Sequence, residues 1–504
     1  MKYQSFIGLE VHIHLLTKTK AFCSCPAAFG DEPNTHVCPV CMGYPGVLPA
    51  LNGEAMRMAA TVALALDCTL SPRTWFERKQ YFYPDMPKNY QISQFASPVG
   101  VGGHVDIPVQ DGAVKRIRIK ECHFEEDAGK MIHTGTMSLI DYNRAGTSLL
   151  EIVTEPDFET GSEAETYIQQ LRRMVRYLGV CDGNMEEGSL RCDANVSVNL
   201  SGHGLGRKVE IKNLNSSRFV RLGLDYEIER QIALIEKGGT VRQETRLWNE
   251  NRDQTEPMRS KESSNDYRFF PEPDLPVFVV DQPFVESARA GLVELPRARE
   301  RRLAEEYGLS AEQAFAICDD RAGADWFEAA VAGSIRRGVD KAVAAGRVAV
   351  WMATDVKRVL NRDGLDASRL ASFRVSSERM AAIVGLVASG RISGTIARQV
   401  FDAVLVDDAE PEAIVAARGW ELVVDPQRIA GAVDAAFAAE AAALAGAVAA
   451  IARGDQGKAR SLCSFLVGKA IAASGGKAEP GLIKAEVDQR LAAASSHQIE
   501  GAQS

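Results

Sequence analysis

The sequence predicts an α+β protein, in which an N-terminal part built on an antiparallel sheet is followed by two all-helical parts. Up to about residue 290 the chain alternates apolar and polar residues in strand-like runs separated by Gly and Pro turns. From Leu295 onward, charged and Ala-rich segments of helical character take over. A break near Asp407 to Pro411 then sets off a small helical tail. We therefore expect three domains, at residues 1–292, 293–406 and 407–504.

Composition narrows the class of protein. The chain has 504 residues, 46% hydrophobic and 25% charged, as in ordinary globular proteins with more than one domain. Its net charge of −9 argues against non-specific DNA binding but leaves room for a local basic patch that binds RNA. Residues 1–20 lack the apolar core of a signal peptide, and the longest apolar run, Ala441 to Ile451, is shorter than a membrane span. We expect a cytoplasmic protein that binds neither membranes nor DNA.

The first predicted strand, Ile7 to Leu15, carries an unusual polar face. Its odd-numbered positions are all apolar, whereas Glu10, His12 and His14 occupy even-numbered positions. Side chains alternate between the two faces of a strand, so these three should share one face.

Three later segments repeat this design with further polar residues. Leu190 to Val198 places Arg191, Asp193, Asn195 and Ser197 on one face, Lys208 to Lys212 contains Glu210, and Ile117 to Asp127 ends in Glu125, Glu126 and Asp127. A solvated face usually carries flexible Lys, Thr and Gln, whereas short carboxylates and a histidine suit hard divalent cations. We predict a metal-binding sheet face; the alternative is an ordinary solvated face of a one-sided sheet.

Four cysteines form two close pairs. Cys23 and Cys25 make a CxC pair, and Cys38 and Cys41 make a CxxC pair, with twelve residues between the two pairs. In a reducing compartment such spacing is typical of a tetrahedral zinc site with four thiolate ligands. A closed site of this kind is structural, so we expect zinc but no catalysis here. The alternative is four unrelated core residues.

The sequence contains no Walker-type phosphate loop, so any phosphate binding must use other residues. Gly475-Gly476-Lys477 lacks the spacing of a Walker motif. If the protein uses ATP, metal ions and basic side chains on the sheet must hold the phosphates. For each basic candidate, the alternative interpretation is an ordinary solvated side chain on the surface. The candidates are Lys79, Lys88, Arg191, Lys208 and Lys212. No cysteine or serine lies in a recognisable triad context for nucleophilic catalysis.

Several motifs resemble one known family, the B subunits of bacterial and organellar aspartyl/glutamyl-tRNA amidotransferases (the GatB family). The motifs cover essentially all of the first ~280 residues. They are Ile7 to His12, the block from Cys23 to Gly46, Tyr81 to Asp85, Glu125 to Lys130, Asp141 to Gly146, Arg191 to Asn195, Glu210 to Asn215, Met258 to Lys261 and Pro271 to Pro276. The helical tail resembles the small YqeY-type module.

The resemblance implies a fold and a site. The N-terminal domain should be a cradle similar to glutamine synthetase, followed by a helical domain and a tRNA-binding tail. The implied residues of the ATP and Mg²⁺ site are Glu10, His12, Glu125, Glu126, Asp193, Glu210, Arg191 and Lys208, of which Glu10, His12 and Glu125 would take part in catalysis. Lys79 would line a channel that delivers ammonia close to the reacting groups.

The resemblance also implies a reaction and partners. ATP would phosphorylate the side-chain carboxylate of a misacylated Asp-tRNA(Asn) or Glu-tRNA(Gln), and ammonia would displace the phosphate to give Asn-tRNA(Asn) or Gln-tRNA(Gln). The ammonia would come from a glutaminase (amidase) A subunit, held in a heterotrimer with a small C subunit. Two other interpretations stay open: an amide ligase that needs no tRNA, and a non-catalytic tRNA-binding scaffold. The sequence does not choose between the two aminoacyl-tRNAs.

Overall fold

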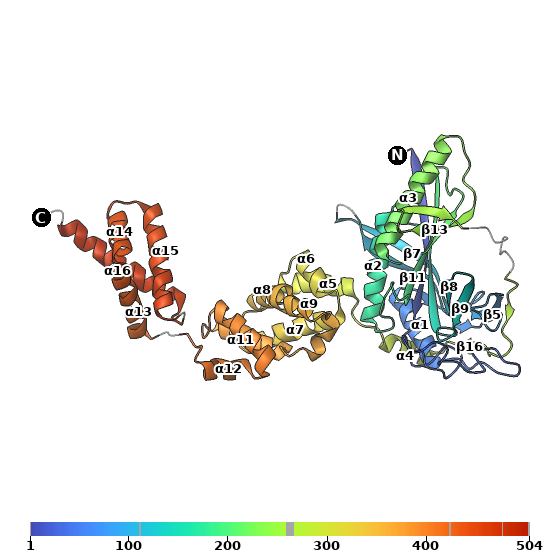
Figure 1. The fold of residues 1–504 in the computed structure, drawn as a ribbon, viewed down its shortest axis with the longest axis horizontal. Coiled ribbons are helices and arrows are strands. Elements are labelled where there is room, and N and C mark those ends of the chain that lie inside the picture. The colour runs from blue at the N-terminus through green and yellow to red at the C-terminus, as the bar shows by residue number, and fades with distance from the viewer. Residues whose placement is uncertain (1, 110–111, 259–266, 423–424, 476, 502–504) are drawn as a thin grey trace. The chain divides into compact units, whose positions relative to one another are not determined.

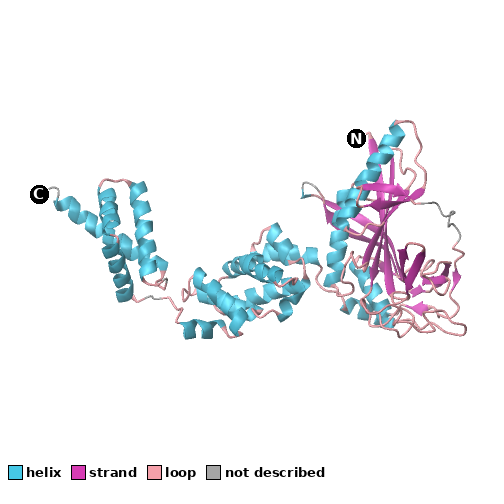
Figure 2. Cartoon of the chain, viewed as in Figure 1, coloured by secondary structure: helices cyan, strands magenta, loops and turns pink. Residues whose placement is uncertain are grey.

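The computed structural model describes residues 2–109, 112–258, 267–422, 425–475 and 477–501, which form two compact units, Met1–Ala298 and Arg299–Ser504 (Figure 1). The first unit mixes strands with a few helices, and the second is helical (Figure 2). The prediction of an α+β protein is confirmed.

Strands dominate the N-terminal unit. They are β1 (Tyr3–His14), β2 (Thr69–Leu70), β3 (Arg73–Thr74), β4 (Glu77–Gln80), β5 (Tyr90–Ser93), β6 (Gly100–Pro108), β7 (Val114–Glu126), β8 (Lys130–Thr134), β9 (Met137–Asp141), β10 (Ser148–Thr154), β11 (Leu190–Leu200), β12 (Val209–Lys212), β13 (Glu244–Asn249), β14 (Gln254–Pro257), β15 (Phe270–Pro271) and β16 (Phe278–Val279). Its helices are α1 (Gly53–Ala65), α2 (Gly161–Tyr177), α3 (Ser217–Glu236) and α4 (Gln282–Ala290).

One large sheet organises this unit. Its main path runs β14-β13-β12-β11-β1-β10-β7-β5-β4-β15, and β6 pairs with β7 and β2. The first strand of the chain therefore lies in the middle, between β10 and β11. The pairs are antiparallel, as predicted, except that β12 and β13 run parallel. The 20-residue helix α3 connects these two strands, and a crossover of that kind returns the chain in the same direction.

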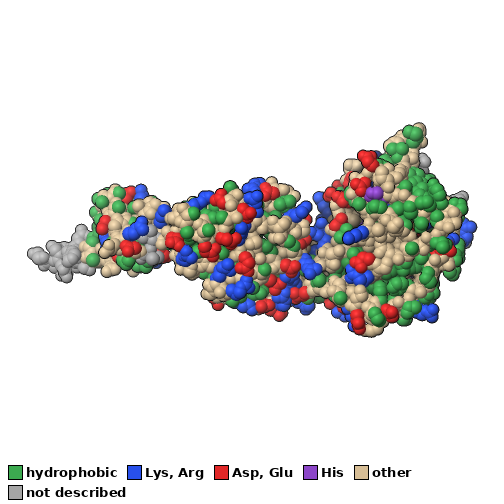
Figure 3. Space-filling view, turned by 90° about the horizontal axis from the view of Figure 1, so that it is seen from below, with side chains coloured by type: hydrophobic (Ala, Val, Ile, Leu, Met, Phe, Trp, Pro, Cys, Tyr) green, Lys and Arg blue, Asp and Glu red, His purple; other side chains and the backbone are tan. Residues whose placement is uncertain are grey.

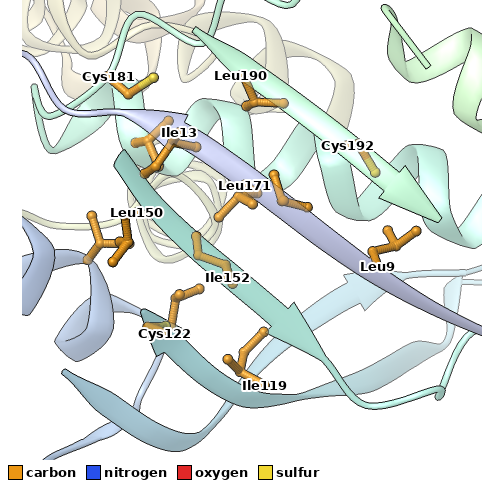
Figure 4. Packing of buried hydrophobic residues seen from close by; sticks show 14 of the residues in the cluster. Leu9, Ile13, Ile119, Cys122, Leu150, Ile152, Leu171, Cys181, Leu190 and Cys192 are labelled. Carbon is orange, nitrogen blue, oxygen red and sulfur yellow. The ribbon is translucent and has the colours of Figure 1, made fainter. Parts of the chain in front are cut away.

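The apolar face of the sheet packs against helices. Leu9, Val11 and Ile13 of β1 have no exposed surface, and they belong to the same hydrophobic core as Ile152 of β10 and Leu171 of α2 (Figure 4). Helix α2 buries one stripe of residues spaced three and four apart, as an amphipathic helix does. Burying a side chain such as Leu9 contributes about 1.5–3 kcal/mol. This packing fixes the register of β1 and so orients its opposite, polar face.

The C-terminal unit contains helices throughout its described part. They are α5 (Pro296–Tyr307, which begins in the first unit), α6 (Ala311–Ile317), α7 (Arg321–Arg336), α8 (Lys341–Trp351), a π-helix (Met352–Val356), α9 (Lys357–Arg362), a 3₁₀-helix (Ala367–Ser372), α10 (Ser377–Ala388), α11 (Gly394–Asp407), α12 (Pro411–Arg418), α13 (Pro426–Ala439), α14 (Ala441–Ala452), α15 (Gln456–Ala473) and α16 (Pro480–Gly501). Two separate hydrophobic clusters form here, one within 303–415 and one within 429–491.

No single helix in the described part of the chain is long and apolar enough to span a membrane. Helices α13 and α14 reach that length and composition only together, and the chain bends by 97° between them.

Candidate active site

The polar face of β1 meets matching polar residues on its neighbours. Glu10 lies opposite Asp193 of β11, and His12 lies between Arg191 of β11 and Glu151 of β10. Residues directly opposite each other in an antiparallel pair point to the same face. The face continues outward to Glu125 on β7, Ser93 on β5 and Lys79 on β4, and on the other side to Glu210 on β12. The sheet therefore gathers side chains that are up to 200 positions apart in the sequence.

His12, Glu125 and Glu151 form a three-donor group. One donor atom from each lies within 4.8 Å of the others. His12 Nε2 is 3.7 Å from Glu151 Oε1 and 4.0 Å from Glu125 Oε1, and the Ser93 hydroxyl donates to Glu125 Oε2 at 3.0 Å. One imidazole nitrogen and two carboxylates at this spacing are a set of ligands that can hold a divalent cation.

The electrostatics of this group favour a bound cation. Burial, together with the neighbouring Glu125 carboxylate, raises the pKa of Glu151 to about 8. Burial and the nearby Arg191 guanidinium lower the pKa of His12 to about 3, so its imidazole is neutral and has a lone pair to offer. The two carboxyl groups repel each other when both are ionised, and a divalent cation bound between them would offset that repulsion.

Glu10, Asp193 and Glu210 form a second acidic group next to the first. Lys212 Nζ lies 2.7 Å from Asp193 Oδ2 and 3.0 Å from Glu210 Oε1. Burial and the two other carboxylates raise the pKa of Glu10, which accepts a 2.9 Å hydrogen bond from Asn195. Burial opposes ionisation of Glu210, but Lys212 outweighs it and the pKa of Glu210 falls below its usual range. Among the described residues, Lys212 thus forms ion pairs with Asp193 and Glu210, whereas it acts on Glu10 only from a longer distance.

Arg191 is a basic side chain beside the His12 group, and Asp127 holds it there. Arg191 Nη2 contacts Asp127 Oδ2 at 2.9 Å, and the same oxygen lies 2.6 Å from His14 Nε2 and 3.4 Å from Arg144 Nε. These partners hold the pKa of the buried Asp127 carboxyl well below its usual range, against the effect of burial. Asp127 thus fixes Arg191 beside His12.

Lys79 and Lys208 lie at opposite sides of this face. The Lys79 ammonium is 5.0 Å from the centre of the Tyr267 ring and lowers the pKa of both His12 and Glu151. Lys208 lines a cavity of about 430 Å³ together with Glu10, Asn195 and Arg207. Both positions suit an anionic group lying along the sheet.

Glu126 lies apart from the other sequence-predicted residues. Adjacent residues of a strand point to opposite faces, and Glu126 pairs with the fully buried Ser148, away from Glu125. Its carboxylate forms an ion pair with Lys88 and accepts a 2.9 Å hydrogen bond from the Ile92 amide. The structure therefore brings together Glu10, His12, Glu125, Asp193, Glu210, Arg191, Lys79 and Lys208, but not Glu126.

The four cysteines converge in the segment between β1 and α1. Donor sulfurs of Cys23, Cys25, Cys38 and Cys41 all lie within 4.8 Å of one another, and those of Cys38 and Cys41 are 3.8 Å apart. A tetrahedral zinc site with Zn–S bonds of about 2.3 Å requires sulfurs about 3.8 Å apart. A hydrogen bond from Cys23 and the nearby Lys20 ammonium lower the pKa of Cys41 to about 4. The cluster fits a structural zinc ion.

Sequence reasoning missed Glu151. It lies in the run from Leu149 to Val153, in which every other residue is apolar. A single acid in an otherwise apolar run was the available signal, because burying an unpaired carboxylate is costly. Its partners His12 and Glu125 could be identified only from the strand order.

Comparison with known proteins agrees with the family resemblance. Residues 5–286 match the model of the GatB/GatE catalytic domain, and residues 334–491 match that of the GatB domain. The B subunit of the aspartyl/glutamyl-tRNA(Asn/Gln) amidotransferase of Halorhodospira halophila is 46% identical over 97% of this chain and 99% of its own length. That of Geobacter sulfurreducens is 46% identical over 97% and 100%, and that of Pseudomonas entomophila is 45% identical over 97% and 100%. The chain therefore belongs to the GatB family of amidotransferase B subunits.

Proposed function

We propose that this protein is the B subunit of an aspartyl/glutamyl-tRNA amidotransferase, which converts misacylated Asp-tRNA(Asn) or Glu-tRNA(Gln) to the amide form with ATP and ammonia. Near-full-length similarity to B subunits supports the reaction. The observation that supports placing the chemistry in this chain is the group of His12, Glu125 and Glu151, with Arg191 beside it.

The chemistry requires an activated carboxyl group. A side-chain carboxylate resists attack by ammonia because oxide is a poor leaving group, whereas the acyl phosphate formed with ATP loses phosphate readily. A Mg²⁺ ion held by His12, Glu125 and Glu151 would neutralise charge on the transferring phosphoryl group. Glu10, Asp193 and Glu210, two of which already pair with Lys212, would line the nucleotide site next to this ion.

This chain's own residues bind and orient the reactants. Arg191, fixed by Asp127, and Lys208, next to Glu10, are placed to pair with phosphate oxygens. Lys79 approaches the opposite side of the His12 group, where ammonia would enter. The nucleophile is ammonia itself, so the mechanism needs no covalent protein intermediate.

Ammonia should come from a partner protein. The relatives are named as B subunits, which agrees with an A subunit that releases ammonia from glutamine and a small C subunit in a heterotrimer. Apolar side chains cover much of one face of the N-terminal unit, whereas opposite charges are interspersed over the helical part (Figure 3). Separately, the exposed large hydrophobic side chains of this unit include Phe29, Leu48 and Met137, with exposed fractions of 72%, 67% and 67%. Such a surface supports contact with another protein.

We assign roles to three domains: a catalytic cradle similar to glutamine synthetase at 1–292, a helical domain at 293–406 and a YqeY-like, tRNA-binding tail at 407–504. Three separate hydrophobic clusters support this division. We place the protein in the cytoplasm, where aminoacyl-tRNA is used.

The test is an amidation assay of the purified chain with ATP, Mg²⁺ and ammonium, using Asp-tRNA(Asn) and Glu-tRNA(Gln) in parallel. Amide formation that is lost in Glu125→Gln would support catalysis in this chain and identify the substrate. A chain that amidates the free amino acid instead would be an amide ligase that needs no tRNA. No product, even after the glutaminase partner is added, would contradict the proposal and favour a scaffold.

A further inference from the structure

Lys20 is a buried cation next to the four cysteines. Its exposed fraction is 0%, and lysine is almost never buried to this extent without partners. Its Nζ donates to the His36 carbonyl at 2.6 Å and to the Tyr142 carbonyl at 3.1 Å, and lies 3.9 Å from Cys41 Sγ. A single ammonium group therefore joins the cysteine cluster, its loop and the turn at 141–146.

That turn is tied to the cysteine loop by further hydrogen bonds. The Asn143 side chain accepts from the His36 amide at 2.8 Å and donates to the Glu32 carbonyl at 2.8 Å. The Ala21 amide, next to Lys20, donates to the Gly146 carbonyl at 2.8 Å. The loop and the turn thus form one hydrogen-bonded layer.

The same turn also contacts the polar face of the sheet. The Gly146 amide donates to the Asp127 carbonyl at 2.9 Å, and Arg144 Nε lies 3.4 Å from the Asp127 carboxylate. That carboxylate holds His14 and Arg191. A continuous set of contacts therefore runs from the cysteine sulfurs, through Lys20 and the turn, to the residue that fixes Arg191.

We propose that Lys20 is a positioning residue that couples the four-cysteine site to the active site. Four thiolates around Zn²⁺ carry a net charge of −2, and a buried ammonium in contact with one sulfur offsets part of it. Its two carbonyl contacts transmit the position of the loop to the turn. Zinc binding then orders the turn and keeps Arg191 in place. The expected change in reaction rate rests on the proposed amidation function; the expected changes in metal binding and turn mobility do not.

The first test compares zinc affinity. Lys20→Met keeps the length of the side chain and removes its charge and donors, and Lys18→Met is the matched control at an exposed position two residues away. We expect Lys20→Met to lose zinc to a chelator at about 10–100-fold lower chelator concentration than the wild type. The thiolate-to-metal absorption of the Co²⁺-loaded protein should shift in this variant alone. Affinity within twofold of the wild type would overturn the role of Lys20.

The second test measures coupling without activity. Chelation should speed amide hydrogen exchange in residues 141–147 of the wild type, whereas zinc should have little effect on that exchange in Lys20→Met. Asn143→Ala is a second variant for the case that Lys20→Met folds poorly, because it removes two hydrogen bonds at a partly exposed position and leaves Lys20 in place. It should weaken the effect of zinc on amide exchange in residues 141–147. An amide exchange rate in the wild type that does not change on removal of zinc would overturn the coupling.

The third test uses the reaction. With zinc saturating, Lys20→Met should lower kcat for ammonia-dependent amidation about 10–100-fold and leave the KM for ATP within twofold. An unchanged kcat would overturn the link to the active site. A wild-type protein that makes no amide would instead contradict the proposed function, and zinc affinity and hydrogen exchange would then decide the role of Lys20.

Discussion

Replacing Glu151 by Gln removes one of the two carboxylates that face His12 while keeping the size of the side chain. A carboxylate next to a divalent cation contributes on the order of 3 kcal/mol to its binding at the effective dielectric of a partly buried site. The Mg²⁺ concentration that gives half-maximal amidation should therefore rise about 100-fold. At low Mg²⁺ the variant should be almost inactive.

The same substitution should stabilise the metal-free protein near neutral pH. Burial and Glu125 raise the pKa of Glu151 from 4.5 to about 8, so near neutral pH the folded protein holds a proton that the unfolded chain has lost. A gap of about 2.5 pH units between 4.5 and neutrality corresponds to roughly 3 kcal/mol of lost stability. Because the pKa is raised, this penalty is absent below about pH 4.5, grows up to about pH 8 and is constant above it.

Two measurements test this reasoning. Amidation as a function of Mg²⁺ concentration gives the functional effect, and hydrogen exchange of the β1 and β10 amides in EDTA, from pH 5 to 8, gives the opening free energy of the sheet. Glu187→Gln, at an exposed position, is the control. A Glu151→Gln protein that is no more stable than the wild type at pH 8, or whose advantage does not grow with pH, would refute the electrostatic account. An unchanged Mg²⁺ requirement would refute the metal site.

Three further predictions concern other parts of the chain. Cys38→Ser should abolish zinc retention and lower the melting temperature of the N-terminal unit, since structural zinc contributes on the order of 10 kcal/mol to folding. Metal analysis and calorimetry check this, with Cys463→Ser as the control. A Cys38→Ser protein that still binds zinc would contradict the prediction. Lys79→Ala should lower glutamine-dependent amidation at least 10-fold because its ammonium lies beside the His12 group; unchanged steady-state rates would exclude that role. Deleting residues 407–504 should raise the KM for tRNA at least 10-fold and leave the KM for ATP unchanged, and equal KM values for tRNA would refute a tRNA-binding tail.

Local patterns in the sequence predicted the parts of the site that depend on local geometry. Alternation in Ile7 to Leu15 placed Glu10 and His12 on one face, because the period of a strand is two residues and the other face must be buried. The spacing of Cys23 to Cys41 predicted the cysteine cluster in the same way. The same alternation separates Glu125 from Glu126, and the sequence-based grouping of the two overlooked it.

Non-local features could not be predicted in this way. Glu151 joins the site only because β10 lies between β1 and β7, and strand order depends on packing of the whole sheet. The parallel pair of β12 and β13 likewise depends on where α3 returns the chain. Lys20 gave no signal, since a buried lysine between two loops has the same local sequence as an exposed one.

The central position of β1 has a consequence for synthesis. His14 pairs with Leu149, and Tyr3 pairs with Leu200, so the first strand to leave the ribosome must wait for partners made 135 to 197 residues later. At about 5–20 residues per second this delay lasts roughly 10–40 s. During that time the apolar side of β1, with Leu9, Val11 and Ile13, has no sheet to join. The nascent chain should therefore need a chaperone until β11 emerges, and the polar face with the candidate site becomes complete only after β12 has been made.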